Sequence, residues 1–123
     1  MKKQKILLID DSSFIRNILK KILNKAGYYN IIEASNGKEG IKQYKNNHPD
    51  IITMDVTMPE MDGITATKEI LKIDKTANII ICSAMGQKSF IYEAIEAGAK
   101  DYIIKPFESE QIINIINRFS ERM

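Results

Sequence analysis

Three carboxylates follow two apolar runs in this chain and could together bind a cation. Asp10 and Asp11 come directly after the apolar residues 6–9, and Asp55 comes directly after the largely apolar residues 51–54. If the two runs are neighbouring parallel strands, their carboxyl ends meet at one edge of the sheet. Clustered carboxylates repel one another unless a cation lies among them, and oxygen ligands of this kind suit Mg²⁺. The sequence therefore predicts a Mg²⁺ site formed by these three carboxylates.

A hydroxyl and an ammonium group stand at the ends of two further apolar runs. Ser83 follows residues 79–82, and Lys105 follows residues 102–104. The Ser83 hydroxyl and the neighbouring backbone N–H of Ala84 can donate hydrogen bonds to a phosphoryl oxygen. Lys105 offers a compact ammonium that can contact the same group. A carboxylate, a cation, a hydroxyl and an ammonium together make a site for a phosphoryl group.

Asp55 is the candidate nucleophile of this site. A carboxylate can attack phosphorus and form an aspartyl phosphate. Because the transition state of phosphoryl transfer is loose, the protein mainly positions groups and balances charge. The backbone carbonyl of Thr57, two residues further along the chain, could supply another ligand to the ion.

Each of these residues also has an ordinary interpretation. Asp10 and Asp11 could simply favour the N-terminus of a helix, and the carboxylates could hold a structural Ca²⁺ or Mg²⁺. Ser83 could be a turn residue. Lys105 could be a surface residue before Pro106, joined to it by the trans bond that sequence alone favours. The occurrence of all these residues at the ends of four apolar runs favours the phosphoryl site.

The segments that must position these residues alternate between two types. Short apolar runs, typical of strands buried on both faces, occupy residues 5–9, 30–34, 51–54, 78–82 and 101–104. Segments in which apolar residues have helical spacing lie at residues 14–23, 38–46, 64–73, 88–97 and 108–118.

This alternation predicts a (βα)5 fold of the α/β class. A doubly wound, parallel, five-stranded sheet would lie between two layers of helices, in a three-layer α/β/α arrangement. We expect the strand order 2-1-3-4-5, which is adopted by analogy with flavodoxin-like domains rather than derived from the residues. In that order, strands 1 and 3 are neighbours, and ligands bind where the order reverses. The three carboxylates are expected at that point.

Size and composition argue against several classes of protein. The 123 residues fit one domain, and we predict a single domain over residues 1–123. The net charge of +2 is too close to neutral to favour nucleic acid or a membrane surface. The apolar runs fall far short of the roughly 20 residues of a membrane span, and Cys82 is the only cysteine. We therefore expect a cytoplasmic protein without disulfides.

The order and spacing of the motifs strongly resemble the receiver domain of two-component response regulators. The motifs are Asp10-Asp11, Asp55, the loop 58–63, Ser83-Ala84 and residues 105–107, and the resemblance extends over residues 5–119. It implies that Asp55 accepts a phosphoryl group from a histidine kinase. It also implies that Mg²⁺ is held by Asp10, Asp11, Asp55 and the backbone carbonyl of Thr57.

The resemblance gives roles to the remaining residues as well. It implies that the phosphoryl group is contacted by Lys105, Ser83 and backbone groups of Ala84 and Thr57. The bond between Lys105 and Pro106 would be cis. Tyr102 would be an aromatic switch that moves inward when Ser83 moves toward the phosphoryl group. The protein would catalyse its own phosphorylation and dephosphorylation without being a turnover enzyme.

Two further stretches narrow the resemblance within the family. Residues 82–87 and 93–101 are similar to the stand-alone chemotaxis receivers of the CheY type. This similarity implies a CheA-like histidine kinase as phosphodonor and a flagellar motor switch protein as output partner. The output surface would lie on residues 88–118, the expected fourth helix, fifth strand and fifth helix. The protein would be a monomer without an output domain, and a phosphatase could act on it.

Three alternatives stay open at this stage. The chain could be a phosphorelay intermediate or a receiver from a longer regulator. A phosphatase of the haloacid dehalogenase type also uses an aspartate nucleophile with Mg²⁺, but it needs a second aspartate where this chain has Thr57. A flavin-binding electron carrier has the same topology, but its first strand should lead into a Ser-, Thr- and Gly-rich phosphate loop instead of Asp10-Asp11.

Overall fold

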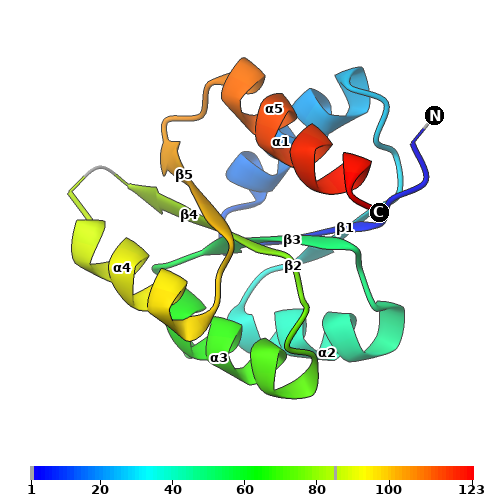
Figure 1. Ribbon diagram of the computed structural model, residues 1–123. Helices are drawn as coiled ribbons and strands as arrows, with labels where there is room; N and C mark the ends of the chain where they lie inside the picture. The colour runs from blue at the N-terminus through cyan, green and yellow to red at the C-terminus, as the bar shows by residue number, and fades with distance from the viewer. Residues whose placement is uncertain (1, 85) are drawn as a thin grey trace.

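The computed structural model describes residues 2–84 and 86–123 of the chain. Strands and helices alternate along the whole described chain (Figure 1). The strands are β1 (Ile6–Ile9), β2 (Ile31–Ala34), β3 (Ile51–Asp55), β4 (Ile79–Ala84) and β5 (Asp101–Lys105). The helices are α1 (Ser13–Lys25), α2 (Gly37–Asn47), α3 (Gly63–Ile73), α4 (Lys88–Ala97) and α5 (Ser109–Glu121). Among these described helices, none is long and apolar enough to cross a membrane.

The strands form one parallel sheet in the order β2-β1-β3-β4-β5. Helices α1 and α5 cover one face of the sheet, and α2, α3 and α4 cover the other (Figure 1). Successive side chains of a strand point to opposite faces. In β1, Ile6 and Leu8 therefore pack with α1 and α5, whereas Leu7 and Ile9 pack with α2 and α3. The predicted fold class and strand order are confirmed, and burial of both faces explains the apolar runs of the inner strands β1, β3 and β4.

Side-chain caps fix the beginnings of three helices at the carboxyl edge of the sheet. The Ser12 side chain accepts a hydrogen bond from the Ile15 N–H at 3.2 Å at the start of α1. Asn36 and Asp62 cap α2 and α3 in the same way, each at 2.8 Å. A cap of this kind satisfies an N–H group that the helix leaves without a partner. The caps on α1 and α3 hold the turns that follow β1 and β3.

Three strands extend further than the sequence predicted. Residue Asp55 is the last of β3, Ala84 the last of β4 and Lys105 the last of β5. The pairing of Asp55 with Cys82 and of Ala84 with Lys105 continues the sheet through these positions. The polar residues were expected just beyond the strands, because the apolar pattern ends before them. The extension places them on the sheet itself, where their backbone is held by neighbouring strands.

Gly63 brings the start of α3 into direct contact with the end of β3. Its N–H donates to the Val56 carbonyl oxygen at 2.8 Å. A Cβ atom at this position would lie 2.0 Å from the Asp55 carbonyl oxygen and 2.9 Å from the Cα of Val56. Both of these atoms belong to the backbone, so no side chain can move aside. The helix begins this close to the strand because residue 63 is a glycine.

We expect the Gly63→Ala variant to lose at least about 3 kcal/mol of unfolding free energy, because the helix and the strand must separate. Urea unfolding followed by circular dichroism measures this loss. Gly86→Ala is the matched control. Gly86 has a φ of +89°, which strains an alanine, but its Cβ would meet nothing within 4 Å, so a loss of about 1 kcal/mol is expected. Equal losses in the two variants would contradict the steric argument.

Candidate functional site

Three carboxylates from two neighbouring strands meet at the carboxyl edge of the sheet. Asp10 and Asp11 follow β1, Asp55 ends β3, and the two strands pair directly, with Ile9 opposite Met54. Asp10, Asp11 and Asp55 each offer an oxygen, and these oxygens all lie within 4.8 Å of one another. Asp10 and Asp55 are buried, whereas Asp11 is exposed. The structure thus brings together the three residues that the sequence proposed as metal ligands.

Lys105 reaches into the carboxylate cluster from β5. Its Nζ lies 3.1 Å from Asp10 Oδ2 and 3.1 Å from Asp55 Oδ1. One ammonium among three ionised carboxylates leaves a formal charge of −2 in a partly buried site. Oxygen donors that carry this excess of negative charge are matched to a divalent cation such as Mg²⁺. The peptide bond between Lys105 and Pro106 is cis.

The ionisation of Asp55 is set by burial and by its neighbours. Burial and, after it, the negative charge of Asp10 raise the pKa of the Asp55 carboxyl, and Lys105 opposes both effects, so that the pKa stands at about 6. Burial lowers the pKa of the Lys105 ammonium, but Asp55 and Asp10 together hold it above its usual value. Lys105 therefore stays charged, and its positive charge alone does not balance the repulsion between the carboxylates.

Ser83, Ala84 and Thr57 are joined by the side chain of Gln87. The buried Ser83 hydroxyl lies 2.9 Å from Gln87 Oε1 and 3.3 Å from the Ala84 carbonyl oxygen. The Ala84 N–H donates to the same Gln87 Oε1 at 2.8 Å. Gln87 Nε2 in turn donates to Thr57 Oγ1 at 3.0 Å. One side-chain amide thus occupies both groups that the sequence proposed as phosphoryl donors.

Tyr102 lies apart from the carboxylates, on the outer part of β5. Its side chain is 44% exposed. It lines a hollow between α4 and β5 together with Ile91, Tyr92 and Ile104. A second hollow, between β5 and α5, also includes Tyr102. In this structure the predicted switch residue therefore belongs to the surface formed by α4, β5 and α5.

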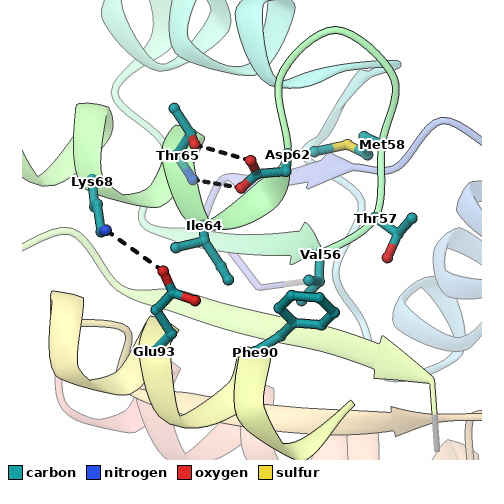
Figure 2. A pocket seen from close by; sticks show the side chains of 9 residues that line it. All are labelled: Val56, Thr57, Met58, Asp62, Ile64, Thr65, Lys68, Phe90 and Glu93. Atoms are coloured by element: carbon teal, nitrogen blue, oxygen red, sulfur yellow. Dashed lines mark hydrogen bonds and ion pairs between the residues drawn. The ribbon is translucent and has the colours of Figure 1, made fainter. Parts of the chain in front are cut away.

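A groove of about 350 Å³ opens beside the site, between the β3–α3 segment and α4. Figure 2 shows Val56, Thr57 and Met58 on one side of the groove and Phe90 and Glu93 of α4 on the other. An ion pair of 3.9 Å between Lys68 and Glu93 joins α3 to α4 across it. The segment that carries Thr57 and the beginning of α4 are thus close neighbours.

Two side chains that the sequence did not single out hold the site together. Arg16 on α1 donates to the Asp10 carbonyl oxygen and forms a 3.0 Å ion pair with Glu33 on β2. Gln87 makes the contacts described above. Neither residue ends an apolar run, and the amphipathic pattern of a helix does not distinguish them from surface residues. Only the position of Gln87, four residues after Ser83, could have suggested a contact.

The chain is similar to known proteins over almost its whole length. The family model of the response regulator receiver domain matches residues 6–117. The chain belongs to this family. The match favours the receiver over the haloacid dehalogenase and flavodoxin alternatives raised by the sequence. The prediction of a single domain over residues 1–123 stays a prediction.

Individual relatives agree with this assignment. The chain is 52% identical to the chemotaxis protein CheY of Thermotoga maritima over 118 residues, which are 96% of this chain and 98% of that protein. It is 53% identical to CheY of Bacillus subtilis over 114 residues, covering 93% and 95% of the two chains. Among solved structures, the receiver domain of the Francisella response regulator 1452 superposes with a TM-score of 0.88 at 30% identity, covering 98% of each chain. CheY4 of Vibrio cholerae superposes with a TM-score of 0.86 at 28% identity, covering 94% and 98%.

The raised pKa of Asp55 predicts how stability depends on pH. The folded protein binds the Asp55 proton more tightly than the unfolded chain does, since the pKa rises from 3.8 to about 6 on folding. The contribution of this group to stability is therefore complete below about pH 4 and is lost as the pH rises through 6. Without divalent cations, Asp55→Asn should gain about 2–3 kcal/mol relative to the native protein between pH 4 and pH 7.

Urea unfolding of both proteins in the presence of a chelator, at several pH values from 4.5 to 7.5, measures this difference. Contributions of titrating groups remote from Asp55 cancel in the comparison. Adding Mg²⁺ at pH 7 should stabilise the native protein more than the variant, because the variant lacks one of the carboxylates. Parallel stability curves for the two proteins would contradict the raised pKa of Asp55.

Proposed function

We propose that this chain is a phosphorylation-activated response regulator that accepts a phosphoryl group from a histidine kinase on Asp55, in a reaction that depends on Mg²⁺. The observation that carries the proposal is the arrangement of Asp55 beside two further carboxylates and the Lys105 ammonium. The family assignment supports it. Asp55 is the last residue of β3, the central strand, which lies between β1 and β4. Asp10 and Asp11, by contrast, follow the end of β1.

The chemistry of the donor set fits Mg²⁺. Asp10, Asp11 and Asp55 would hold the ion, and the Thr57 backbone carbonyl would add a ligand. When bound, Mg²⁺ supplies positive charge that offsets the repulsion of the carboxylates and of the phosphoryl oxygens. Lys105 keeps Asp55 oriented through its 3.1 Å contact. Ser83, Lys105 and the backbone of Ala84 and Thr57 would receive the phosphoryl oxygens.

The transfer is a single displacement at phosphorus. A carboxylate oxygen of Asp55 attacks the phosphorus of a phosphohistidine, and a P–O bond forms as the P–N bond breaks. The leaving imidazole nitrogen keeps the electron pair and takes up a proton from water. Attack of water on the acyl phosphate later breaks the P–O bond to Asp55, returning the carboxylate and releasing inorganic phosphate. We propose that the chain is in this sense a phosphoacceptor that catalyses its own phosphorylation and dephosphorylation and is not a turnover enzyme.

Acetyl phosphate tests the phosphoacceptor directly. With Mg²⁺, the native protein should gain the mass of one phosphoryl group in intact-protein mass spectrometry. Asp55→Asn should gain none, because the nucleophile is absent, and a chelator should suppress labelling of the native protein. Asp50→Asn is the matched control, since Asp50 is an exposed aspartate at the opposite edge of the sheet, and it should label like the native protein. Equal labelling of Asp55→Asn and native protein would refute the assignment.

We further propose that the signal is chemotactic and leaves through the surface of α4, β5 and α5. The two CheY proteins at 52% and 53% identity support the pathway. The exposed side chains of Tyr92, Ile95 and Tyr102 give this surface an apolar character suited to a protein partner. The partners would be a CheA-like kinase and a flagellar motor switch protein, in the cytoplasm, with the receiver acting as a monomer. A partner that prefers the phosphorylated arrangement shifts the population toward it.

Binding to the motor switch protein should depend on both phosphorylation and Tyr102. We expect the phosphorylated native protein to bind the switch protein of the same organism at least about tenfold more tightly than the unphosphorylated protein. Tyr102→Ala should lose most of this gain, as measured by surface plasmon resonance. Tyr29→Ala is the matched control, because Tyr29 is 58% exposed and precedes β2, at the edge of the sheet remote from β5. Equal binding with and without phosphorylation would contradict the proposed output.

A further inference from the structure

The Gln87 side-chain amide contacts the two groups that would donate hydrogen bonds to the proposed phosphoryl group, the Ser83 hydroxyl and the Ala84 N–H. Gln87 Oε1 lies 2.9 Å from the Ser83 hydroxyl oxygen and 2.8 Å from the Ala84 nitrogen. A serine hydroxyl and a backbone N–H have one hydrogen each to donate. Neither can serve Gln87 and a phosphoryl oxygen fully at the same time. Phosphorylation of Asp55 must therefore displace Gln87 before both donors can turn to the phosphoryl group.

The other end of the amide is held from the strand that carries Asp55. Gln87 Nε2 donates to Thr57 Oγ1 at 3.0 Å. Thr57 lies two residues after Asp55, in the segment that faces α4 across the groove in Figure 2. The amide thus bridges the segment after β3 and the segment after β4. Three contacts fix its orientation, so it is a positioned group rather than a freely moving surface side chain.

The same residue begins the helix that carries part of the output surface. Gln87 is the N-cap residue of α4, and its backbone carbonyl accepts from the N–H groups of Phe90 at 3.1 Å and Ile91 at 3.2 Å. Its side chain makes no cap hydrogen bond, because it is turned toward Ser83, Ala84 and Thr57. The residue whose side chain holds Ser83 and Ala84 is therefore also the residue at which α4 begins.

We propose that Gln87 is a built-in competitor of the phosphoryl group, which holds the Ser83 hydroxyl and the Ala84 N–H until phosphorylation releases them. This inference rests on the proposed phosphoacceptor function of Asp55. Gln87 is a positioning residue: it opposes the phosphorylated arrangement through Ser83 and Ala84. Its release is the step that connects the chemistry at Asp55 with the beginning of α4.

The affinity of the protein for beryllofluoride, a stable mimic of the phosphoryl group, tests the competition in the presence of Mg²⁺. In Gln87→Ala, the Ser83 hydroxyl and the Ala84 N–H would donate to water instead of to the amide. A phosphoryl oxygen displaces water more easily than it displaces a positioned amide. It should bind beryllofluoride about threefold to tenfold more tightly than the native protein. Gln87→Glu should bind it at least about tenfold more weakly, because a carboxylate accepts from the same donors more strongly and adds a negative charge.

Gln43→Ala is the matched control. Gln43 is a glutamine on α2 whose amide contacts Asn47, outside the site, and its variant should bind like the native protein. Native-like or weaker binding by Gln87→Ala would overturn the proposed competition. If the native protein itself bound no beryllofluoride with Mg²⁺, the phosphoacceptor function would fail instead, and the two failures are therefore distinct.

The contact itself can be tested without metal or phosphate analogue. In ¹⁵N-resolved spectra of the metal-free protein, Gln87→Ala should move the Ala84 amide proton upfield and speed its exchange with solvent. Gln43→Ala should leave the Ala84 amide unchanged. An unchanged Ala84 amide in Gln87→Ala would overturn the inference whatever the analogue binding shows.

A double-mutant cycle tests whether Thr57 and Gln87 act through the hydrogen bond between them or independently. Thr57→Val removes the acceptor of Gln87 Nε2 and keeps the backbone carbonyl of residue 57. If Thr57 acts by holding Gln87, the gain in beryllofluoride affinity of the double variant should be smaller than the product of the two single gains. Independent, multiplying effects would contradict the bridge between the two segments.

Discussion

The fold forces three carboxylates into one site, and the repulsion between them governs what the site can bind. Asp10 and Asp55 are buried within reach of each other and of Asp11. Lys105 offsets part of the repulsion, through two contacts of 3.1 Å, but burial together with the charge of Asp10 still raises the pKa of Asp55 to about 6. The folded protein therefore holds a site that is incomplete without positive charge. A site of this kind gains stability from a cation and retains a reactive carboxylate at neutral pH.

The sheet maintains this arrangement through its backbone. Parallel pairing of β1 with β3, with Ile9 opposite Met54, fixes the distance between the strand ends that carry the carboxylates. Both strands are buried on both faces, so neither can shift along the other without moving two layers of packed side chains. The start of α3 at Gly63 also lies directly against the backbone of Asp55 and Val56, which restrains the end of β3. The energy that holds the charges together thus comes from apolar packing distant from the charges.

The sequence predicted the parts of the fold and site that follow from strand ends. Largely apolar runs in strict alternation with helical segments were sufficient for the fold class, and Asp10, Asp55, Ser83 and Lys105 were recognised because each follows such a run. The strand order came from analogy. The extension of β3, β4 and β5 through the polar residues was missed, because hydrogen bonding to neighbouring strands holds them in the sheet regardless of their polarity. Arg16 and Gln87 were missed because their contacts depend on the packing of separate elements and leave no periodic pattern.

Gln87 shows how a charge at Asp55 can reach a surface on another part of the molecule. Ser83 lies at the end of β4, Gln87 follows that strand and Thr57 follows the adjacent strand β3, and the three contacts of the Gln87 amide lie within 3.0 Å. The Ser83 hydroxyl and the Ala84 N–H cannot serve an amide oxygen and a phosphoryl group fully at the same time, so the proposed competition gives these donors two alternative acceptors. Because Gln87 is also the N-cap of α4, each arrangement sets a different environment for the first turn of that helix. The proposed exchange of hydrogen-bond acceptors would in this way connect Asp55 with a surface that begins at α4.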